Sequence, residues 1–204
     1  MSTDCDVIII GSGIGGATLA SALAPTGARI MVLERGEHLP DSPDARADVA
    51  IFGRGVYRSS EKWLGADGKK FLPGNYYYVG GNSKFYGAVM YRYRAQDFLP
   101  RRHLRGASPG WDLSYADMEP WYDRAEALFR VRGTAAEDPT EPPRSGPYPH
   151  PAVPDEPAIR DLRARLGKAG VHPASLPLAL DIDAWLRRGK TGWDAFPNTG
   201  GAGK

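Results

Sequence analysis

The 204-residue chain has very little cysteine: Cys5 is its one cysteine, so no disulfide can form within it. The formal net charge is only +2, from 26 Lys and Arg against 24 Asp and Glu, which gives no strong basic field for nucleic acid. No apolar run approaches the ~20 residues needed to cross a bilayer, and the charged start MSTDCD lacks the basic segment of a signal peptide. We therefore expect a globular protein of the cytoplasm, with neither a membrane span nor a nucleic-acid partner.

The chain does have 42% hydrophobic residues, enough for a core in one or two domains, and its N-terminus has a strand–helix–strand pattern. Residues 6–10 form a β-branched run typical of a strand buried on both faces of a parallel sheet. Residues 13–24 are rich in Ala and Leu and are followed by a proline and a glycine, which predicts a helix that ends there. A second strand is expected at residues 29–33, directly before Glu34.

Gly11, Gly13 and Gly16 have the spacing G-x-G-x-x-G between the first strand and the helix. In this motif the glycines allow a tight turn, close approach of a pyrophosphate to the helix N-terminus, and close packing of helix on strand. Glu34 lies 23 residues after Gly11, where a carboxylate can accept hydrogen bonds from ribose hydroxyls and would repel a 2′-phosphate, which argues against NADP. The motif alone does not separate NAD from FAD, and the same glycines can serve only the packing of a βαβ unit.

A second glycine-rich motif, GGNSKFYGA, occupies residues 80–88 between two segments expected to be strands, residues 76–79 and 89–93. Its small residues let main-chain amides approach a flat ring or phosphate oxygens, although a tight turn between strands would use the same residues. The preceding residues, 36–76, are expected to be mostly loop with a short hairpin near residues 69–72. A loop of that length in a compact domain usually covers something.

The second half of the chain predicts two helices joined by an irregular segment. Residues 114–131 begin with a serine followed three residues later by an aspartate, a capping-box variant, and Pro120 is expected in the first turn. Prolines recur through residues 139–157, and residues 159–170 predict an amphipathic helix closed by a glycine. The glycine-rich stretch at residues 191–204 has no period of strand or helix. One face of the first helix carries Trp121, Ala125, Leu128 and Phe129.

Three stretches in this order, VIIIGSGIGGATLASALA with LERG, GGNSKFYGAVMYR, and WDLSYADMEPWYDRAEALFRVRG, resemble the glucose–methanol–choline family of flavin-dependent oxidoreductases. The resemblance spans essentially the whole chain. It implies an α/β fold with a Rossmann-like FAD-binding βαβ domain, incomplete, and with irregular and helical extensions that belong to the substrate domain. Residues 1–110 would be the N-terminal FAD-binding domain, and residues 111–204 part of an incomplete FAD and substrate domain. Because later strands complete the fold in the family, the chain is expected to be an N-terminal fragment.

The resemblance implies FAD as the cofactor, and non-covalent FAD, since no histidine for covalent attachment occurs between Tyr76 and Arg102. The first glycine motif and Glu34 would hold the adenine dinucleotide half, and the second motif would lie along the flavin and pyrophosphate. The family often has asparagine where this chain has Tyr86, so at this position we expect contacts to the flavin from the backbone and not from the side chain. The expected cofactor-binding residues are Gly11, Ser12, Gly13, Ile14, Gly15, Gly16, Glu34, Arg35, Gly80, Gly81, Ser83, Tyr86, Gly87 and Ala88.

The implied reaction is oxidation of an alcohol, in which a base takes the hydroxyl proton while a hydride passes to the flavin. In the family a histidine, with a second histidine or an asparagine, does this near the end of a longer chain. The four histidines here, His38, His103, His150 and His172, do not match that motif. No catalytic residue and no metal site is predicted. We expect the chain to be inactive alone. Together with a complementary C-terminal half, it would act on a small-molecule alcohol substrate.

Two other functions stay open at this point. The chain could be a non-catalytic FAD- or NAD-binding module, or a partner subunit, that uses the same fold without redox turnover. An amine-oxidase or desaturase type of flavoprotein shares the first motif, but it would usually carry R-x-G-G-R soon after the acid, and LERGEHLPDSPDAR does not. A cluster of aromatic residues could line a cleft near the flavin or pack in the core: Tyr76, Tyr77, Tyr78, Phe85 and Tyr86.

Overall fold

The computed structural model describes residues 4–183, which form two compact units, residues 4–86 (unit 1) and residues 87–183 (unit 2). The change of unit falls inside the second glycine-rich motif, between Tyr86 and Gly87. The functional division expected after residue 110 stays a prediction. The stretch at residues 191–204, for which no regular period was expected, lies outside the described residues.

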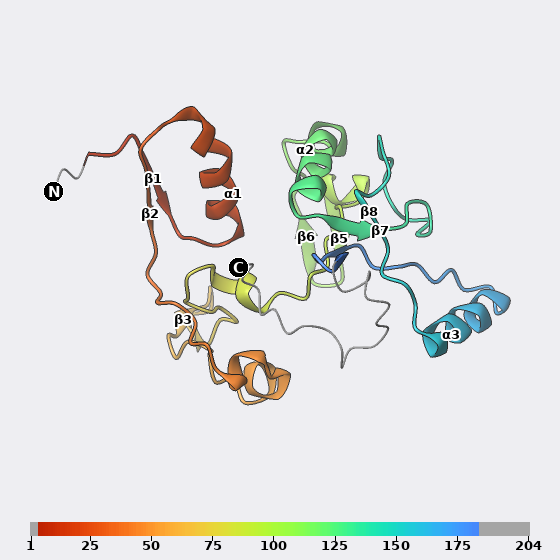
Figure 1. The fold of residues 1–204 in the computed structure, drawn as a ribbon, viewed down its shortest axis with the longest axis horizontal. Helices are drawn as coiled ribbons and strands as arrows, with labels where there is room; N and C mark the ends of the chain where they lie inside the picture. The colour runs from red at the N-terminus through yellow and green to blue at the C-terminus, as the bar shows by residue number, and fades with distance from the viewer. Residues whose placement is uncertain (1–3, 184–204) are drawn as a thin grey trace. The chain divides into compact units, whose positions relative to one another are not determined.

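Unit 1 begins with a Rossmann-like βαβ element (Figure 1). Strand β1 (Val7–Ile10) pairs in parallel with β2 (Ile30–Leu33), and helix α1 (Ile14–Leu23) connects them. A 3-10 turn, η1 (Ala24–Thr26), continues α1, and Gly27 ends it at φ +75°, a left-handed conformation that glycine adopts without a steric penalty. These bounds confirm the predicted order of strand, helix and strand.

The prediction that the first strand is buried on both faces is wrong within unit 1. Ile9 is 5% exposed and faces α1, whereas Ile8 and Ile10 are 55% and 87% exposed. Side chains alternate between the two faces of a strand, so a single helix can cover only one set. The β1–β2 pair therefore has one covered face and one apolar face open in this unit.

The rest of unit 1 is largely irregular, as expected, and its core is aromatic. Ile51, Tyr57 and Tyr76 are buried together, and Phe85 packs on them with its ring centroid 4.6 Å from that of Tyr76. The predicted hairpin is confirmed, since β3 pairs antiparallel with β4. The short elements of this region are η2 (Pro43–Arg46), η3 (Val49–Gly53), β3 (Trp63–Leu64), β4 (Lys70–Phe71) and η4 (Gly81–Phe85).

The two segments predicted as strands around the second glycine motif, residues 76–79 and 89–93, do not form strands. Each has a neighbouring chain paired with it at only one bridge position, and a ladder needs a partner that runs alongside for several residues. The two bridges join Glu37 to Tyr78 and Val89 to Leu178.

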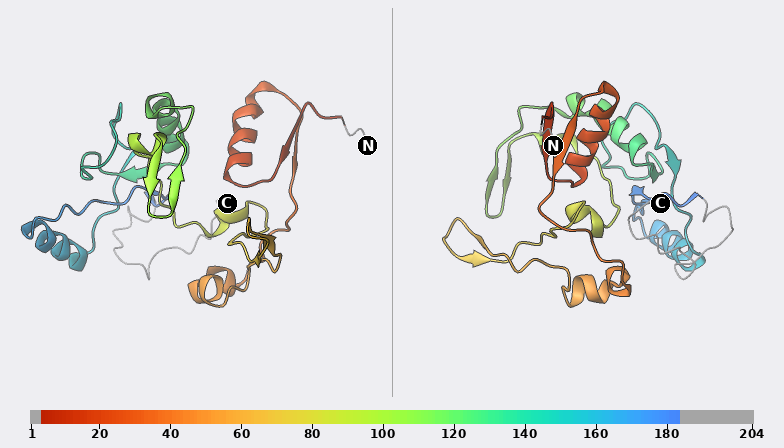
Figure 2. Two further views of the ribbon diagram at one scale, coloured as in Figure 1. Left: turned by 180° about the vertical axis from the view of Figure 1, so that it is seen from behind. Right: turned by 60° about the vertical axis from the view of Figure 1, so that its left-hand side comes forward.

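Unit 2 combines two helices with short strands (Figures 1 and 2). β7 lies between β8, which is parallel to it, and β9, which is antiparallel. β5 and β6 form a separate hairpin, drawn in green in the left view of Figure 2. The predicted second helix is confirmed, with Gly170 at φ +79° after its end, and the proline-rich segment is irregular apart from β8. The elements are η5 (Ala95–Phe98), β5 (Arg101–His103), β6 (Gly106–Ser108), α2 (Tyr115–Leu128), β7 (Val131–Gly133), β8 (His150–Pro151), α3 (Pro157–Lys168) and β9 (Leu178–Ala179).

Helix α2 has the predicted capping box: the Ser114 hydroxyl accepts from the Asp117 amide, and the Asp117 carboxylate accepts from the Ser114 amide. Pro120, expected in the first turn, lies inside the helix because α2 already begins at Tyr115. Trp121 and Leu128, from the apolar face noted in the sequence, are 58% and 53% exposed. The buried positions of α2 are instead polar or amphipathic, Tyr115 and Glu126.

A buried ionic network fills the space that an apolar face would otherwise occupy. The Arg92 guanidinium donates to both carboxylate oxygens of Glu126, at 2.7 and 2.8 Å, to Asp123 at 2.5 Å and to the Tyr115 hydroxyl at 3.1 Å. Burial disfavours its charge, but these hydrogen bonds outweigh burial and raise the pKa of Arg92. Arg144 gives Glu126 a second cationic partner. The network attaches the chain after the second glycine motif to α2.

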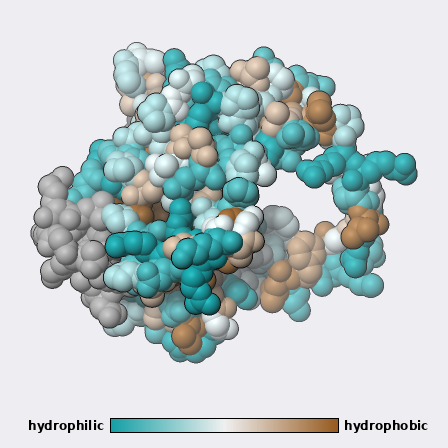
Figure 3. Space-filling model, turned by 90° about the vertical axis from the view of Figure 1, so that its right-hand side faces the viewer, coloured by the Kyte–Doolittle hydropathy of each residue, from teal (hydrophilic) through white to brown (hydrophobic). Residues whose placement is uncertain are grey.

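The face of the molecule in Figure 3 is mostly hydrophilic, with hydrophobic residues in small separate areas. Scattered apolar residues of this kind are usual on protein surfaces. Among residues 4–183, the helices are too short or too polar to span a bilayer.

Candidate functional site

The turn between β1 and α1 is shaped by its glycines. Gly11 is at φ +93°, and its amide donates to the Leu33 carbonyl at 2.7 Å, which extends the pairing of β1 with β2 by one residue. A Cβ on Gly16 would lie 2.0 Å from the Gly11 carbonyl oxygen and 3.2 Å from Ile9. The third glycine of the motif is therefore the point where helix and strand approach too closely for any side chain.

The N-terminus of α1 has no acceptor from a side chain. Gly13 is its N-cap, the cap makes no side-chain hydrogen bond, and the first turn has no acidic residue. The amides of this turn lack partners within the helix, and the helix dipole makes this end positive. Their geometry suits an anionic oxygen such as that of a pyrophosphate.

The Glu34 carboxylate is held by the same turn, as its position at the end of β2 predicts. Its Oε2 accepts from the Ser12 hydroxyl at 2.5 Å and from the Ser12 amide at 2.9 Å, and its Oε1 accepts from the Gly36 amide at 2.9 Å. These hydrogen bonds, that of the Ser12 hydroxyl first, lower the pKa of Glu34 from 4.5 to about 2. The Glu34 carboxylate is therefore ionised and held in place, and it can still accept a hydrogen bond from a ligand.

The second glycine motif begins directly against this turn. The Gly80 amide donates to the Ser12 hydroxyl oxygen at 2.8 Å, across 68 positions of sequence. Gly80 and Gly81 are at φ +94° and +55°, and a Cβ on Gly81 would lie 3.9 Å from the Gly13 Cα. The Ser83 hydroxyl donates back to the Gly80 carbonyl at 2.6 Å, which closes the turn.

Unit 1 thus brings together most of the residues predicted to bind the cofactor. These are Gly11, Ser12, Gly13, Ile14, Gly15, Gly16, Glu34, Arg35, Gly80, Gly81 and Ser83. Tyr86 is the last residue of unit 1, and Gly87 and Ala88 belong to unit 2, where the Ala88 carbonyl accepts from the Ala179 amide at 2.8 Å. The roles of these three residues at a cofactor stay predictions.

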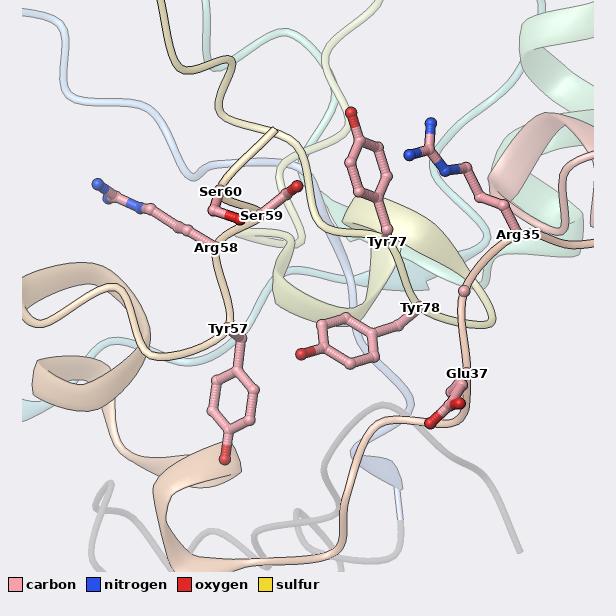
Figure 4. Close-up of a pocket in the computed structure, with 9 residues that line it drawn as sticks. Arg35, Glu37, Tyr57, Arg58, Ser59, Ser60, Tyr77 and Tyr78 are labelled. Carbon is pink, nitrogen blue, oxygen red and sulfur yellow. The ribbon is translucent and has the colours of Figure 1, made fainter. Parts of the chain in front are cut away.

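An open cavity of about 490 Å³ in unit 1 is lined in part by Arg35, Gly36 and Glu37, which follow Glu34 in the chain (Figure 4). The Arg35 guanidinium lies over the Tyr77 ring, 3.8 Å from its centroid, and forms an ion pair with Glu61. The Tyr78 ring is directed across the cavity toward Tyr57, with centroids 6.1 Å apart. The lining residues are Arg35, Gly36, Glu37, Tyr57, Arg58, Ser59, Ser60, Tyr77 and Tyr78.

Sequence analysis missed the part of this wall that residues 57–60 form. The length of the loop was its only sign, because nothing in its composition distinguishes these residues from their neighbours. Tyr77 and Tyr78 line the cavity, whereas Tyr76 and Phe85 belong to the aromatic core. The aromatic cluster therefore serves both of the uses that the sequence left open.

The described histidines do not gather into a site. His103 lies on the exposed strand β5, and His150 on β8 is 3.9 Å from Asp183. Within residues 4–183, His, Cys, Asp and Glu form no group of three or more that could hold a metal ion.

Comparisons with known proteins agree with this geometry. Residues 9–51 match the model of the NAD(P)-binding Rossmann-like domain. The chain is 30% identical over 181 residues to 6‴-hydroxyparomomycin C oxidase of Streptomyces lividus, an alignment that covers 87% of this chain and 32% of that protein. It is 28% identical over 181 residues to 2-methyl-1,2-propanediol dehydrogenase of Mycolicibacterium austroafricanum, with 82% and 32% covered. It is 30% identical over 195 residues to paromamine 6′-oxidase of Streptomyces fradiae, with 88% and 31% covered.

Solved structures show the same fold. Pyridoxine 4-oxidase from Mesorbium loti superposes with a TM-score of 0.50 at 20% identity, over 97% of this chain and 41% of that one. An FAD-dependent oxidoreductase from Chaetomium thermophilum does so with a TM-score of 0.51 at 20% identity, over 88% and 34%. The chain spans about a third of the length of the curated relatives named above.

Proposed function

We propose, from the premise that the chain belongs to the glucose–methanol–choline family of flavin-dependent oxidoreductases, that it binds FAD non-covalently and holds it for the oxidation of an alcohol. One observation carries the proposal. The glycine turn, the acid that ends β2 and the second glycine motif are joined by hydrogen bonds through Ser12. Each of these features alone is common, but the glycine turn with the acid beside it is the arrangement that binds a dinucleotide, and here the second glycine motif meets it.

The residues present fit a dinucleotide. The amides at the start of α1 have no side-chain acceptor, and no heavy atom lies within 4 Å of a Cβ built on Gly11 or Gly15. A ligand can therefore approach the backbone there. Glu34 supplies an ionised acceptor for a ribose hydroxyl, and part of its acceptor capacity is already used by Ser12 and by the amides that follow it.

When bound, the flavin supplies the hydride acceptor. The residues of this chain would orient it: the amides of residues 13–16 hold the pyrophosphate, Glu34 holds the ribose, and residues 80–83 lie toward the flavin. We assign none of the four histidines as the base that takes the proton of the alcohol. That base is proposed to come from the part of its relatives' length that this chain does not span.

The cofactor assignment is tested by the visible spectrum of protein mixed with FAD and then desalted. Retained flavin absorbance is expected, and a Gly13→Asp variant should lose it because a carboxylate at the helix N-terminus repels the pyrophosphate. Ser21→Asp adds the same charge to an exposed position later in α1 and should retain flavin. Flavin release by trichloroacetic acid distinguishes non-covalent from covalent attachment. Tighter binding of NAD than of FAD in calorimetric titration would refute the flavin assignment.

The enzymatic part of the proposal needs a second chain. We expect alcohol oxidation when the chain is combined with the remaining two thirds of a relative, and none with either part alone. The activity is measured as reduction of an electron-accepting dye. Flavin binding without activity in every combination would favour a non-catalytic binding module or partner subunit. The cytoplasmic location stays a prediction that cell fractionation can check.

A further inference from the structure

We propose that Ser12 is a positioning residue, whose hydroxyl fixes the acid of the cofactor site and the second glycine motif in one arrangement. The proposal rests on the proposed function, because it concerns the site assigned to the dinucleotide. The Gly80 amide donates to the Ser12 hydroxyl oxygen at 2.8 Å, and that hydroxyl donates to Glu34 Oε2 at 2.5 Å. Three segments far apart in sequence meet at one oxygen atom.

The direction of these hydrogen bonds is fixed by the chemistry of the two outer groups. An amide N–H can only donate, and an ionised carboxylate can only accept. The Ser12 hydroxyl has one proton and two lone pairs, so it accepts a hydrogen bond from the Gly80 amide and donates one to Glu34. An alanine methyl at this position could do neither, whereas a threonine hydroxyl has the same donor and acceptor on one atom.

The same geometry sets what Glu34 can offer to a ligand. Oε2 already accepts two hydrogen bonds from Ser12, and Oε1 accepts one from the Gly36 amide. Most of the acceptor capacity of this carboxylate is therefore used within the protein, since the Arg35 amide also hydrogen-bonds to it. A ribose that engaged both carboxylate oxygens would have to displace the Ser12 hydroxyl from Oε2, and the Gly80 amide would lose its fixed partner. Ser12 thus links how the acid is presented to how the second motif is held.

Replacing Ser12 tests this link directly. Ser12→Ala leaves the Gly80 amide without its partner and removes one hydrogen bond from the Glu34 carboxylate, which keeps those of the Ser12 and Gly36 amides. We expect FAD affinity to fall on the order of 10-fold, as for loss of a hydrogen bond to a charged group. Ser12→Thr keeps the hydroxyl and should restore affinity to within about threefold of the original chain. The matched control is Ser21→Ala, at an exposed position of the same helix, which should not change it.

A double-mutant cycle separates positioning from direct contact. If Ser12 acts through Glu34, then Ser12→Ala in a Glu34→Gln background should weaken FAD binding by much less than it does alone, about twofold. The same four proteins are also compared by urea unfolding without any ligand, where the two substitutions should again be non-additive. Additive effects in both measurements, or unchanged FAD affinity in Ser12→Ala, would overturn the proposal. Failure of the unsubstituted chain to retain FAD would instead refute the proposed function, and the unfolding cycle would still report on the Ser12 link.

Discussion

Replacement of Arg92 by methionine should destabilise the chain strongly, because Arg92 is the buried cation shared by three carboxylates in unit 2. The Arg92 side chain is 1% exposed, and three carboxylates and a tyrosine hydroxyl lie within hydrogen-bonding or ion-pair distance of it. Methionine fills a similar volume but leaves these groups without their common cation. Because Glu119, Asp123 and Glu126 follow one another on α2 at helical spacing, they would also repel each other.

The size of the effect follows from what remains after the substitution. Removing one member of a buried ion pair costs about 3–5 kcal/mol. Arg144 still reaches Glu126, and the Ser145 hydroxyl still donates to Asp123, so we expect the lower end, about 3 kcal/mol. For a chain of this length that corresponds to a fall in melting temperature of about 6–12 °C. Arg92→Lys should lie in between, since an ammonium keeps the charge but cannot donate from a planar fork.

Urea unfolding followed by far-ultraviolet circular dichroism measures the difference. Arg101→Met is the matched control: Arg101 pairs with Asp97, but its side chain is 66% exposed, so the change should stay within about 0.5 kcal/mol. If Arg92→Met unfolds within 1 kcal/mol of the original chain, on the order of the effect of an average substitution, the reasoning about this network is refuted.

Three further predictions follow from the fold and the site. Gly16→Ala forces a Cβ to 2.0 Å from the Gly11 carbonyl oxygen and should lower the free energy of unfolding by about 1–3 kcal/mol. Gly15→Ala, with open space at its Cβ, should be neutral or stabilising, and thermal unfolding of the two variants tests the difference. Ser114→Ala removes the α2 cap and should cost about 0.5–2 kcal/mol in urea unfolding; an unchanged midpoint would contradict the capping argument. The folded-state pKa of Glu34 is depressed to about 2, so its contribution to stability is complete above pH 4.5 and is lost as the pH falls toward 2; Glu34→Gln should flatten the stability–pH curve in that window.

The parts of the fold that could be predicted are those whose signals are local. The β-branched run, the glycine spacing and the acid at the end of β2 lie within one short segment, and the capping box of α2 lies within four residues. The pattern of residues that predicts a strand is also local, and it is present on both sides of the second glycine motif. A strand forms only if another segment, distant in the sequence, pairs with it over several residues. Each of the two segments meets its neighbour at only one bridge position.

The buried face of α2 could not be predicted for a related reason. Its apolar residues Trp121 and Leu128 suggest an inward face, yet Glu126 is 4% exposed because Arg92 meets it from outside the helix. A charged residue becomes a core residue only when its counter-ion is in place, and the sequence of the helix holds no information about that partner.

Gly36, outside both glycine motifs, allows a close approach that the sequence does not reveal, because the reason for it is steric. A Cβ on Gly36 would lie 2.2 Å from the Tyr77 carbonyl oxygen, so the residues after Glu34 and those before Gly80 run close together only because position 36 has no side chain. Three residues after Tyr77, the Gly80 amide donates to the Ser12 hydroxyl, which in turn donates to Glu34. The glycine of LERG therefore allows the close approach of the two segments that carry the site, although in the sequence it is only the first residue of the expected loop.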